Sequence, residues 1–199
     1  MRYEKGRKDV THDRILEVAA CKLRKDGIAG SGLAGIMSDA GLTNGAFYAH
    51  FSSKNELVEK SLERATDEQW HQFEKEIASG QLLKVVRAYL SEQHRDHPEA
   101  GCASAALLPE ISRQDPDTRR VYTESVKRLL DAVAKQLEGV PKGPKAREIA
   151  IGTLGLLIGT LQLARAVDDP SLSKQMLAAG ANVAATLIQF GQNKQVGGS

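Results

Sequence analysis

Residues 41–57, "GLTNGAFYAHFSSKNEL", gather many hydrogen-bonding and basic groups into one short segment. The donors are two hydroxyls, an amide, an imidazole and an ammonium group, on Thr43, Tyr48, Asn44, His50 and Lys54. No carboxylate occurs between residues 40 and 55. A surface with donors and bases but no acids suits a partner that carries phosphate groups. The segment therefore indicates a phosphate-binding surface, with its aromatic rings divided between that surface and a core.

The remainder of the chain shows no pattern typical of an enzyme. We find no nucleophile paired with a base, no glycine-rich phosphate loop before a helix, and no paired carboxylates. One cluster has the residue types of a metal site, namely His94, Asp96, His97, Glu99 and Cys102. Histidines three residues apart at a helix end are more often solvated or capping groups. We therefore expect no catalytic residue, no metal and no cofactor.

Composition is that of a globular protein, with 41% hydrophobic residues, 26% charged residues and a net charge of +2. The basic excess lies in residues 1–64, which contain 11 Lys/Arg and 9 Asp/Glu, whereas the rest contains 16 of each. The two cysteines, Cys21 and Cys102, fall in different predicted helices, which indicates reduced thiols and a cytoplasmic location. Residues 1–10 contain no apolar run, so they are not a secretory signal.

Helical periodicity accounts for nearly the whole chain, and no strand pattern or repeat emerges, so we predict an all-α fold. Thr11 suits the N-cap of a first helix that reaches Asp26. Short helices follow at 33–40 and about 44–50, and Ser52 or Ser53 caps a longer one to about 79. Three further helices are predicted at about 81–95, 102–113 and 116–138. After a loop at 139–145, two more helices follow, one that ends at 167 and one at 172–190, which gives nine helices in total.

Residues 33–50 have the spacing of a helix-turn-helix, with Gly41 in the turn. The second helix of this motif enters the major groove of DNA and places its first residues near base edges. Gly45 and Ala46 are small enough for close approach, and Thr43 and Asn44 have groups that bond bases or phosphates. Phosphate contacts are predicted for Tyr48, His50 and Lys54. Phe47 and Phe51 then form the inward face.

The segment "THDRILEVAACKLRKDGIAGSGLAGIMSDAGLTNGAFYAHFSSKNEL" resembles the DNA-binding domain of TetR-family transcriptional regulators. The resemblance spans about 47 residues and includes the "YAHFSSK" boundary. Gly32 stands where the family commonly has a threonine that caps the second helix and touches phosphate, and Ser31 is expected to take over this role. Met37 and Asn55 also depart from the family pattern. The resemblance implies a DNA-binding domain at 11–57, preceded by a flexible basic arm at 1–10.

For residues 58–191 the resemblance implies a helical effector-binding and dimerisation domain, followed by a disordered tail at 192–199. It implies a ligand-responsive regulator, most simply a homodimeric repressor that leaves a pseudo-palindromic operator when an unknown small molecule binds. We expect the effector-binding site to be lined by Trp70, Phe73, Val86, Tyr89, Leu90, Cys102, Leu107, Ile111 and Tyr122. The last two helices are expected to form the dimer interface, through Gly152, Gly155, Leu156, Gly159, Leu163, Ala181 and Ala185.

Two alternatives stay open. Cys102 falls in the first turn of a predicted helix, where the positive end of the helix favours a thiolate, so redox or electrophile sensing competes with simple packing. Residues 149–164 form a run of 16 uncharged residues, short for a membrane span of about 20. A buried helix of a soluble protein, without membrane contact, is the preferred interpretation.

Overall fold

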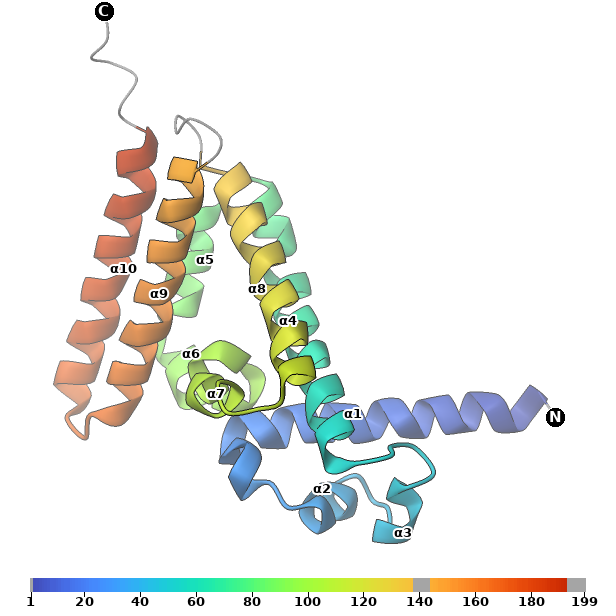
Figure 1. The fold of residues 1–199 in the computed structure, drawn as a ribbon. Helices are drawn as coiled ribbons and strands as arrows, with labels where there is room; N and C mark the ends of the chain where they lie inside the picture. The colour runs from blue at the N-terminus through green and yellow to red at the C-terminus, as the bar shows by residue number, and fades with distance from the viewer. Residues whose placement is uncertain (1, 138–143, 193–199) are drawn as a thin grey trace, which may run out of the picture. The chain divides into compact units, whose positions relative to one another are not determined.

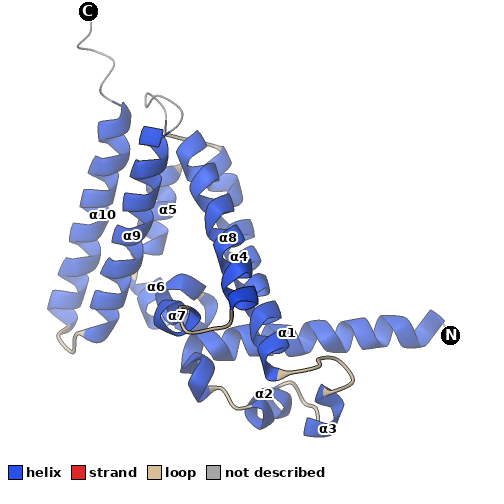
Figure 2. Cartoon of the chain, in the orientation of Figure 1, coloured by secondary structure: helices blue, strands red, loops and turns tan. Residues whose placement is uncertain are grey.

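The computed structural model describes residues 2–137 and 144–192, and within them every regular element is a helix (Figures 1 and 2). The all-α prediction is confirmed. The elements are α1 (Arg2–Gly30), α2 (Leu33–Asp39), α3 (Asn44–Phe47), α4 (Lys54–Ala78), α5 (Leu82–Tyr89), α6 (Glu92–Asp96), the 3-10 helix η1 (Pro98–Ala100), α7 (Ala103–Ile111), α8 (Pro116–Lys135), α9 (Pro144–Ala166) and α10 (Pro170–Gln192).

Two predicted helix boundaries are wrong. α1 begins at Arg2 rather than Thr11, so residues 2–10, which we expected to be an arm, are helical; no proline interrupts them. The predicted helix 81–95 is divided into α5 and α6, which raises the number of α-helices in the described residues to ten. The division occurs because Ser91 is extended (φ −109, ψ 156) and its side chain caps a new helix by accepting a hydrogen bond from the His94 N–H.

Two other predictions fall largely on residues that the structure does not describe. Residues 139–143 of the predicted loop 139–145 lie outside the described residues, as do residues 193–199 of the predicted tail. The remaining residues of these segments belong to α9 and α10.

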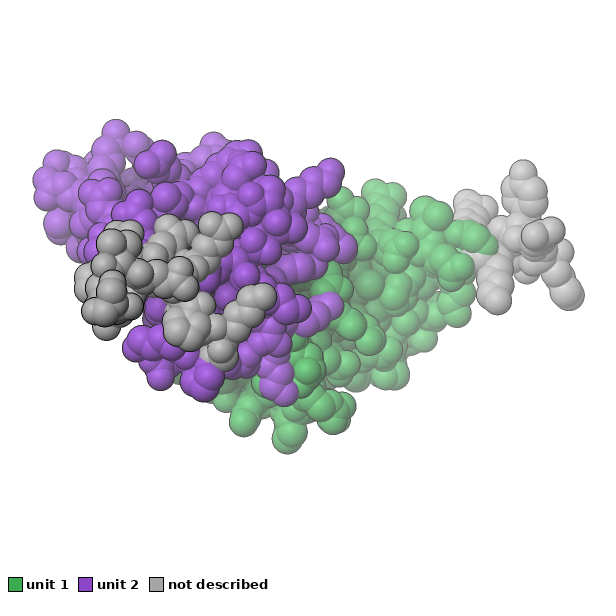
Figure 3. All heavy atoms as spheres, turned by 90° about the horizontal axis from the view of Figure 1, so that it is seen from above, with its two compact units in different colours: residues 1–69, 98–125 green, residues 70–97, 126–199 purple. Residues whose placement is uncertain are grey.

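The chain forms two compact units (Figure 3). Unit 1 comprises residues 1–69 and 98–125, and unit 2 comprises residues 70–97 and 126–199. The N-terminal helices α1 to α3 therefore share a unit with η1, α7 and parts of α4 and α8. The division we predicted at residue 57 stays a prediction, and the compact units do not follow it.

Unit 1 contains two hydrophobic clusters that both involve α1. The first, here called the reading-head core, consists of Ile15, Leu16, Ala19, Ile36, Met37, Ala40, Phe47, Phe51 and Leu57. The second, here called the α7 core, consists of Ala20, Leu23, Ile28, Val58, Leu62, Ala65, Ala103, Leu107 and Ile111. The apolar stripe of α1 thus enters one core along its middle and the other core near its C-terminal end. α1 and α4 contribute to both cores, α4 through Leu57 in the first and Val58 in the second.

In unit 2, α9 and α10 lie side by side (Figure 1). Gly180 permits this close approach, because a Cβ atom there would lie 2.5 Å from Thr160 Cγ2. α9 is long and apolar enough to cross a membrane by length and composition. Seven of its residues are buried in this fold, Leu157 and Leu161 among them. The apolar residues of α9 therefore contribute to the hydrophobic interior of unit 2.

Candidate nucleic-acid interface

The turn between α2 and α3 is built by a left-handed glycine. Gly41 has φ 70, a conformation that side chains rarely adopt. Its N–H donates to Ser38 O at 2.9 Å, and the N–H of Leu42 donates to Met37 O at 2.8 Å. This pair of bonds is a Schellman motif, which satisfies the last carbonyls of α2 and stops the helix. Ala40, fully buried beside the turn, leaves room for the two helices to cross. The predicted turn at Gly41 is confirmed.

The aromatic residues of the segment are divided as predicted. Phe47 and Phe51 are 1% and 2% exposed, and their rings stack with centroids 5.6 Å apart in the reading-head core. Tyr48 is 73% exposed, and its ring meets the edge of Phe47. A tyrosine that is largely exposed and supported by a buried ring presents its hydroxyl to a partner outside the unit.

The exposed side of α3 carries the residues expected to read DNA. Thr43, the N-cap residue of α3, and the neighbouring Asn44 and Gly45 are exposed, and Ala46 is half-buried. The side chain of Thr43 makes no cap hydrogen bond. Gly32, the N-cap residue of α2, is also exposed. The first acid after the turn, Glu56, accepts hydrogen bonds from the Ser52 amide and hydroxyl, which lower its pKa. The exposed face of α3 therefore combines hydrogen-bonding groups with an absence of carboxylates.

His50 lies at the end of this face as a half-buried neutral group. Its Nδ1 atom is buried, and no described residue forms a hydrogen bond with it. Burial lowers the pKa of His50, and the nearby His12 and Lys8 lower it further. The imidazole of His12 stacks on Phe51 with ring centroids 4.7 Å apart and lies 6.3 Å from the His50 ring. His50 thus offers a neutral ring N–H for hydrogen bonding, rather than a fixed positive charge.

Lys54 is the first residue of α4, where the N-terminus of the helix also favours anions. Its Nζ donates to Ile28 O at 3.3 Å, which leaves two N–H groups for a phosphate. The preceding cap follows the prediction, because the Glu56 N–H donates to Ser53 Oγ at 3.1 Å. The carboxylate of Glu56 bonds Ser52, one residue earlier than a standard capping box requires.

Ser31 does not take the predicted phosphate-binding role. It is 0% exposed, and its hydroxyl donates to Gly27 O at 2.7 Å. The sequence placed a small hydroxyl next to the predicted second helix, but a buried hydroxyl bonded to the preceding helix is not accessible to a phosphate. We therefore remove Ser31 from the set of DNA-contact residues.

The residues expected to line an effector site are distributed over both units. Cys102, Leu107, Ile111 and Tyr122 belong to unit 1, and Trp70, Phe73, Val86, Tyr89 and Leu90 to unit 2. Leu107 and Ile111 are part of the α7 core. In unit 1, Ser104 Oγ and Tyr122 OH lie 2.8 Å apart, and burial raises the pKa of Tyr122. These positions remain predictions for a ligand site.

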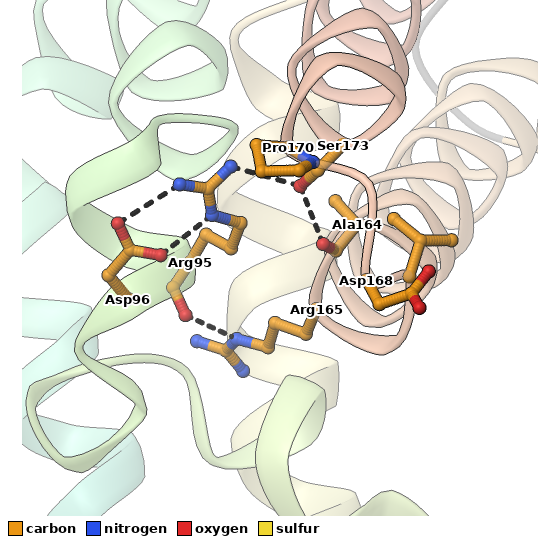
Figure 4. A pocket seen from close by; sticks show the side chains of 8 residues that line it. Arg95, Asp96, Ala164, Arg165, Asp168, Pro170 and Ser173 are labelled. Atoms are coloured by element: carbon orange, nitrogen blue, oxygen red, sulfur yellow. Dashed lines mark hydrogen bonds and ion pairs between the residues drawn. The ribbon is translucent and has the colours of Figure 1, made fainter.

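A pocket of about 240 Å³ lies elsewhere, in unit 2 (Figure 4). It is lined by residues that are not among those predicted to line the effector site, namely Arg95, Asp96, Ala164, Arg165, Val167, Asp168, Pro170 and Ser173. Its polar groups bond one another: Arg95 Nη1 donates to Ser173 Oγ at 2.9 Å, and Arg165 Nε donates to Arg95 O at 3.0 Å. These bonds attach α6 to the C-terminal end of α9 and to the first turn of α10. The pocket wall is therefore a structural clamp, and we assign no ligand to it.

The residues predicted for the dimer interface differ in exposure, those on α9 being more exposed than those on α10. Gly152 and Gly155 are exposed, and Leu163 is 59% exposed. Leu156 and Gly159 are half-buried. Ala181 and Ala185 are half-buried on sides of α10 that face away from its exposed stripe. Exposed apolar residues of α10 include Leu172, Ala178, Ala179 and Val183. The alanine content of this helix did not identify which face is open.

Two residues of the site were missed. His12 contacts Phe51, and Arg14 covers the turn, where its Nη2 would lie 3.1 Å from a Cβ on Gly41. Both precede the helix-turn-helix in the chain and looked like solvated residues of a first helical turn. Their spacing within α1 carries no sign of these contacts, which depend on how α1 packs on α2 and α3.

The sequence pattern of the tetR family of bacterial regulatory proteins matches residues 15–60. These residues include the turn at Gly41, the inward rings and the start of α4. A search of curated proteins found no match.

Several solved structures share the fold. Reduced NemR of E. coli is 19% identical, with a TM-score of 0.74 over 88% of this chain and 95% of that protein. A TetR-family regulator from Cytophaga hutchinsonii is 16% identical, with a TM-score of 0.75 over 90% and 96% of the two chains. One from Chloroflexus aurantiacus J-10-fl is 20% identical, with a TM-score of 0.72 over 95% and 97%. Residues 15–60 therefore match the tetR family of bacterial regulatory proteins, and the chain shares its fold with solved TetR-family regulators.

Proposed function

We propose that this chain is a cytoplasmic homodimeric repressor that binds a pseudo-palindromic DNA operator and releases it when a small-molecule effector binds. The observation that carries the DNA-binding part is the exposed face of α3. It combines Thr43, Asn44 and Tyr48 with small residues and no carboxylate, on a helix held by the Gly41 turn. A major groove admits such a helix, and phosphates on either side bond the flanking hydroxyl, imidazole and ammonium groups.

The homodimer is supported by an apolar surface on α9 and α10. Among the residues whose burial the structure describes, seven large hydrophobic ones are exposed, and four of them lie on these two helices, namely Ile151, Leu163, Leu172 and Val183. Gly152, Gly155 and Gly159 belong to the same face of α9, and an added Cβ at any of them would meet no atom within 4 Å. Glycines that serve no packing purpose inside one protomer allow a second helix to approach closely. Two such protomers present two helix-turn-helix motifs, as an operator with two half-sites requires.

The effector is proposed from the chemistry of the predicted lining residues. Unit 1 contains both the apolar Leu107 and Ile111 and the hydrogen-bonded pair of Ser104 and Tyr122. An apolar interior with a few polar groups suits a largely apolar ligand that carries one hydrogen-bonding group. The family resemblance alone supports repression rather than activation.

The DNA-binding proposal is tested by selecting duplexes from a random library with the wild-type protein. The affinity for the selected duplex is then measured against salt concentration for wild type, Lys54→Ala and Lys84→Ala. Lys84 is an exposed lysine of unit 2 paired with Glu76, and it serves as the matched control. We expect Lys54→Ala to reduce the salt slope by about one, because one phosphate contact is lost, and Lys84→Ala to leave it unchanged. An unchanged slope for Lys54→Ala would contradict the phosphate role.

A second function, sensing of electrophiles through Cys102, is supported by one observation. Cys102 is the N-cap residue of α7, it is 3% exposed, and α7 packs against α1 in unit 1. Addition of a bulky group to this thiol would disturb a helix that touches the DNA-binding helices. The E. coli NemR structure that shares this fold is of the reduced form of that protein. Treatment with N-ethylmaleimide should release the selected duplex from wild type and Cys21→Ser but not from Cys102→Ser; release from all three would exclude Cys102 as the sensor.

A further inference from the structure

α1 is broken near its C-terminal end, and a carboxylate from α7 occupies the break. Gly27 has φ 80 and ψ 166, so the backbone leaves the helical path for one residue. The N–H of Ala29, just beyond the break, donates to Glu110 Oε2 at 2.9 Å. A Cβ on Gly27 would lie 2.6 Å from Glu110 Oε1. Only glycine therefore leaves space for this carboxylate against the backbone, and the carboxylate satisfies an N–H group that the break leaves without a helical partner.

The same end of α1 is also attached to η1 and α4. Arg24, which is 8% exposed, donates from Nε to Glu99 O at 2.7 Å and places Nη2 3.5 Å from the Glu68 carboxylate. Lys54 donates to Ile28 O. Each of these contacts is within unit 1. The short segment from Gly27 to Gly32 that leads into α2 is therefore fixed by groups from α4, η1 and α7.

This attachment determines how the reading head is presented. The first residue of α2, Leu33, follows Ser31 by two positions, and Ser31 itself bonds Gly27 O. One part of α1 packs in the reading-head core with Phe47 and Phe51, and its C-terminal part packs in the α7 core. A change in backbone direction at Gly27 would thus alter the path by which the chain enters the helix-turn-helix, although neither Gly27 nor Glu110 belongs to the proposed DNA surface.

We propose that Glu110 is a positioning residue for DNA recognition: its carboxylate, seated on the Gly27 break, holds α2 and α3 in the orientation that reads base edges. The inference rests on the DNA-binding function proposed above. Base contacts require accurate placement of α3, whereas attraction to phosphates tolerates small rotations. Loss of the Glu110 contact should therefore reduce discrimination between DNA sequences more than it reduces general attraction to DNA.

The test compares Glu110→Ala and Glu110→Gln with the wild-type protein, and uses Glu124→Ala as a control at an exposed carboxylate on α8. Affinity is measured by fluorescence anisotropy for the duplex selected by wild type and for a random-sequence duplex. We expect Glu110→Ala to bind the selected duplex about tenfold more weakly, the effect of one lost charge-assisted hydrogen bond, and to bind the random duplex as wild type does. Glu110→Gln, whose amide oxygen still accepts from the Ala29 N–H, should recover most of the affinity.

A second measurement separates positioning from simple loss of stability. Hydrogen exchange at the Ala29 amide should accelerate in Glu110→Ala but not in Glu110→Gln, while exchange in the reading-head core stays as in wild type. The inference is overturned if Glu110→Ala binds the selected duplex with wild-type affinity, if both duplexes weaken equally, or if exchange accelerates throughout unit 1. If wild type selects no duplex at all, the proposed DNA-binding function fails instead.

Discussion

Gly180 and Gly155 provide a matched pair of substitutions on the two long helices of unit 2. Alanine at Gly180 would place its Cβ 2.5 Å from Thr160 Cγ2, 2.7 Å from Oγ1 and 3.0 Å from Cβ. At Gly155 an added Cβ would meet nothing within 4 Å. In a helix interior alanine is favoured over glycine by about 1 kcal/mol, so the two substitutions share one favourable effect and differ in the clash.

The clash at Gly180 cannot be relieved without a cost in free energy. Both γ atoms of Thr160 and its Cβ crowd the same point, so rotation of this β-branched side chain leaves an atom in the way. α9 and α10 must then separate slightly, and overpacking of this kind costs about 1–3 kcal/mol. After the propensity gain, we expect Gly180→Ala to lower the free energy of unfolding by up to about 2 kcal/mol. Gly155→Ala should raise it by about 0.5–1 kcal/mol within the protomer.

Thermal unfolding followed by circular dichroism measures both changes at a single protein concentration, with all proteins also carrying Leu163→Glu so that the proposed dimer does not contribute. For a chain of this size the midpoint shifts by about 2–4 °C per kcal/mol, so Gly180→Ala should unfold several degrees below Gly155→Ala. Thr160→Ala removes both γ atoms, and combining it with Gly180→Ala should recover much of the loss as a coupling energy. If Gly180→Ala unfolds at or above the temperature of the Leu163→Glu parent, the close approach of α9 and α10 does not depend on this glycine.

Three further outcomes are expected. Leu163→Glu and Val183→Glu should give monomers in sedimentation, since each buries an unpaired charge in the proposed interface, while Leu108→Glu in unit 1 should not; intact dimers for both would exclude this surface. Burial lowers the pKa of His94, and the nearby Arg165 lowers it further, whereas the hydrogen bond to Tyr89 O raises it. Because the net change is a lower pKa, the unfolded chain binds the proton more readily than the folded chain does. Stability should therefore fall as pH falls below about 6.5, and urea unfolding of His94→Gln should show a weaker dependence; an unchanged dependence would refute this. An effector found by screening should bind more weakly when operator DNA is saturating, by the same factor as it weakens DNA binding, and equal affinities would disprove their coupling.

The reading head could be predicted because its determinants are local. Helical periodicity placed Phe47 and Phe51 on one face and left Tyr48 outside, and the structure confirms both. Gly41 indicated a sharp turn because few other residues adopt a left-handed conformation. Each of these inferences uses residues within one or two helical turns of each other. The sequence by itself therefore determined the fold class, the helix-turn-helix and its exposed face.

Tertiary structure decided the features that depend on distant contacts. The Gly27 break became a site for Glu110 through an interaction between residues 81 positions apart, and Ser31 became inaccessible because it bonds back to Gly27. The open face of α10 includes Val183 rather than the predicted Ala181, because the position of α9 determines which side is covered. Periodicity shows that a helix has two faces. Which of the two faces is buried depends on the helix that packs against it, and that helix can lie far away in the sequence.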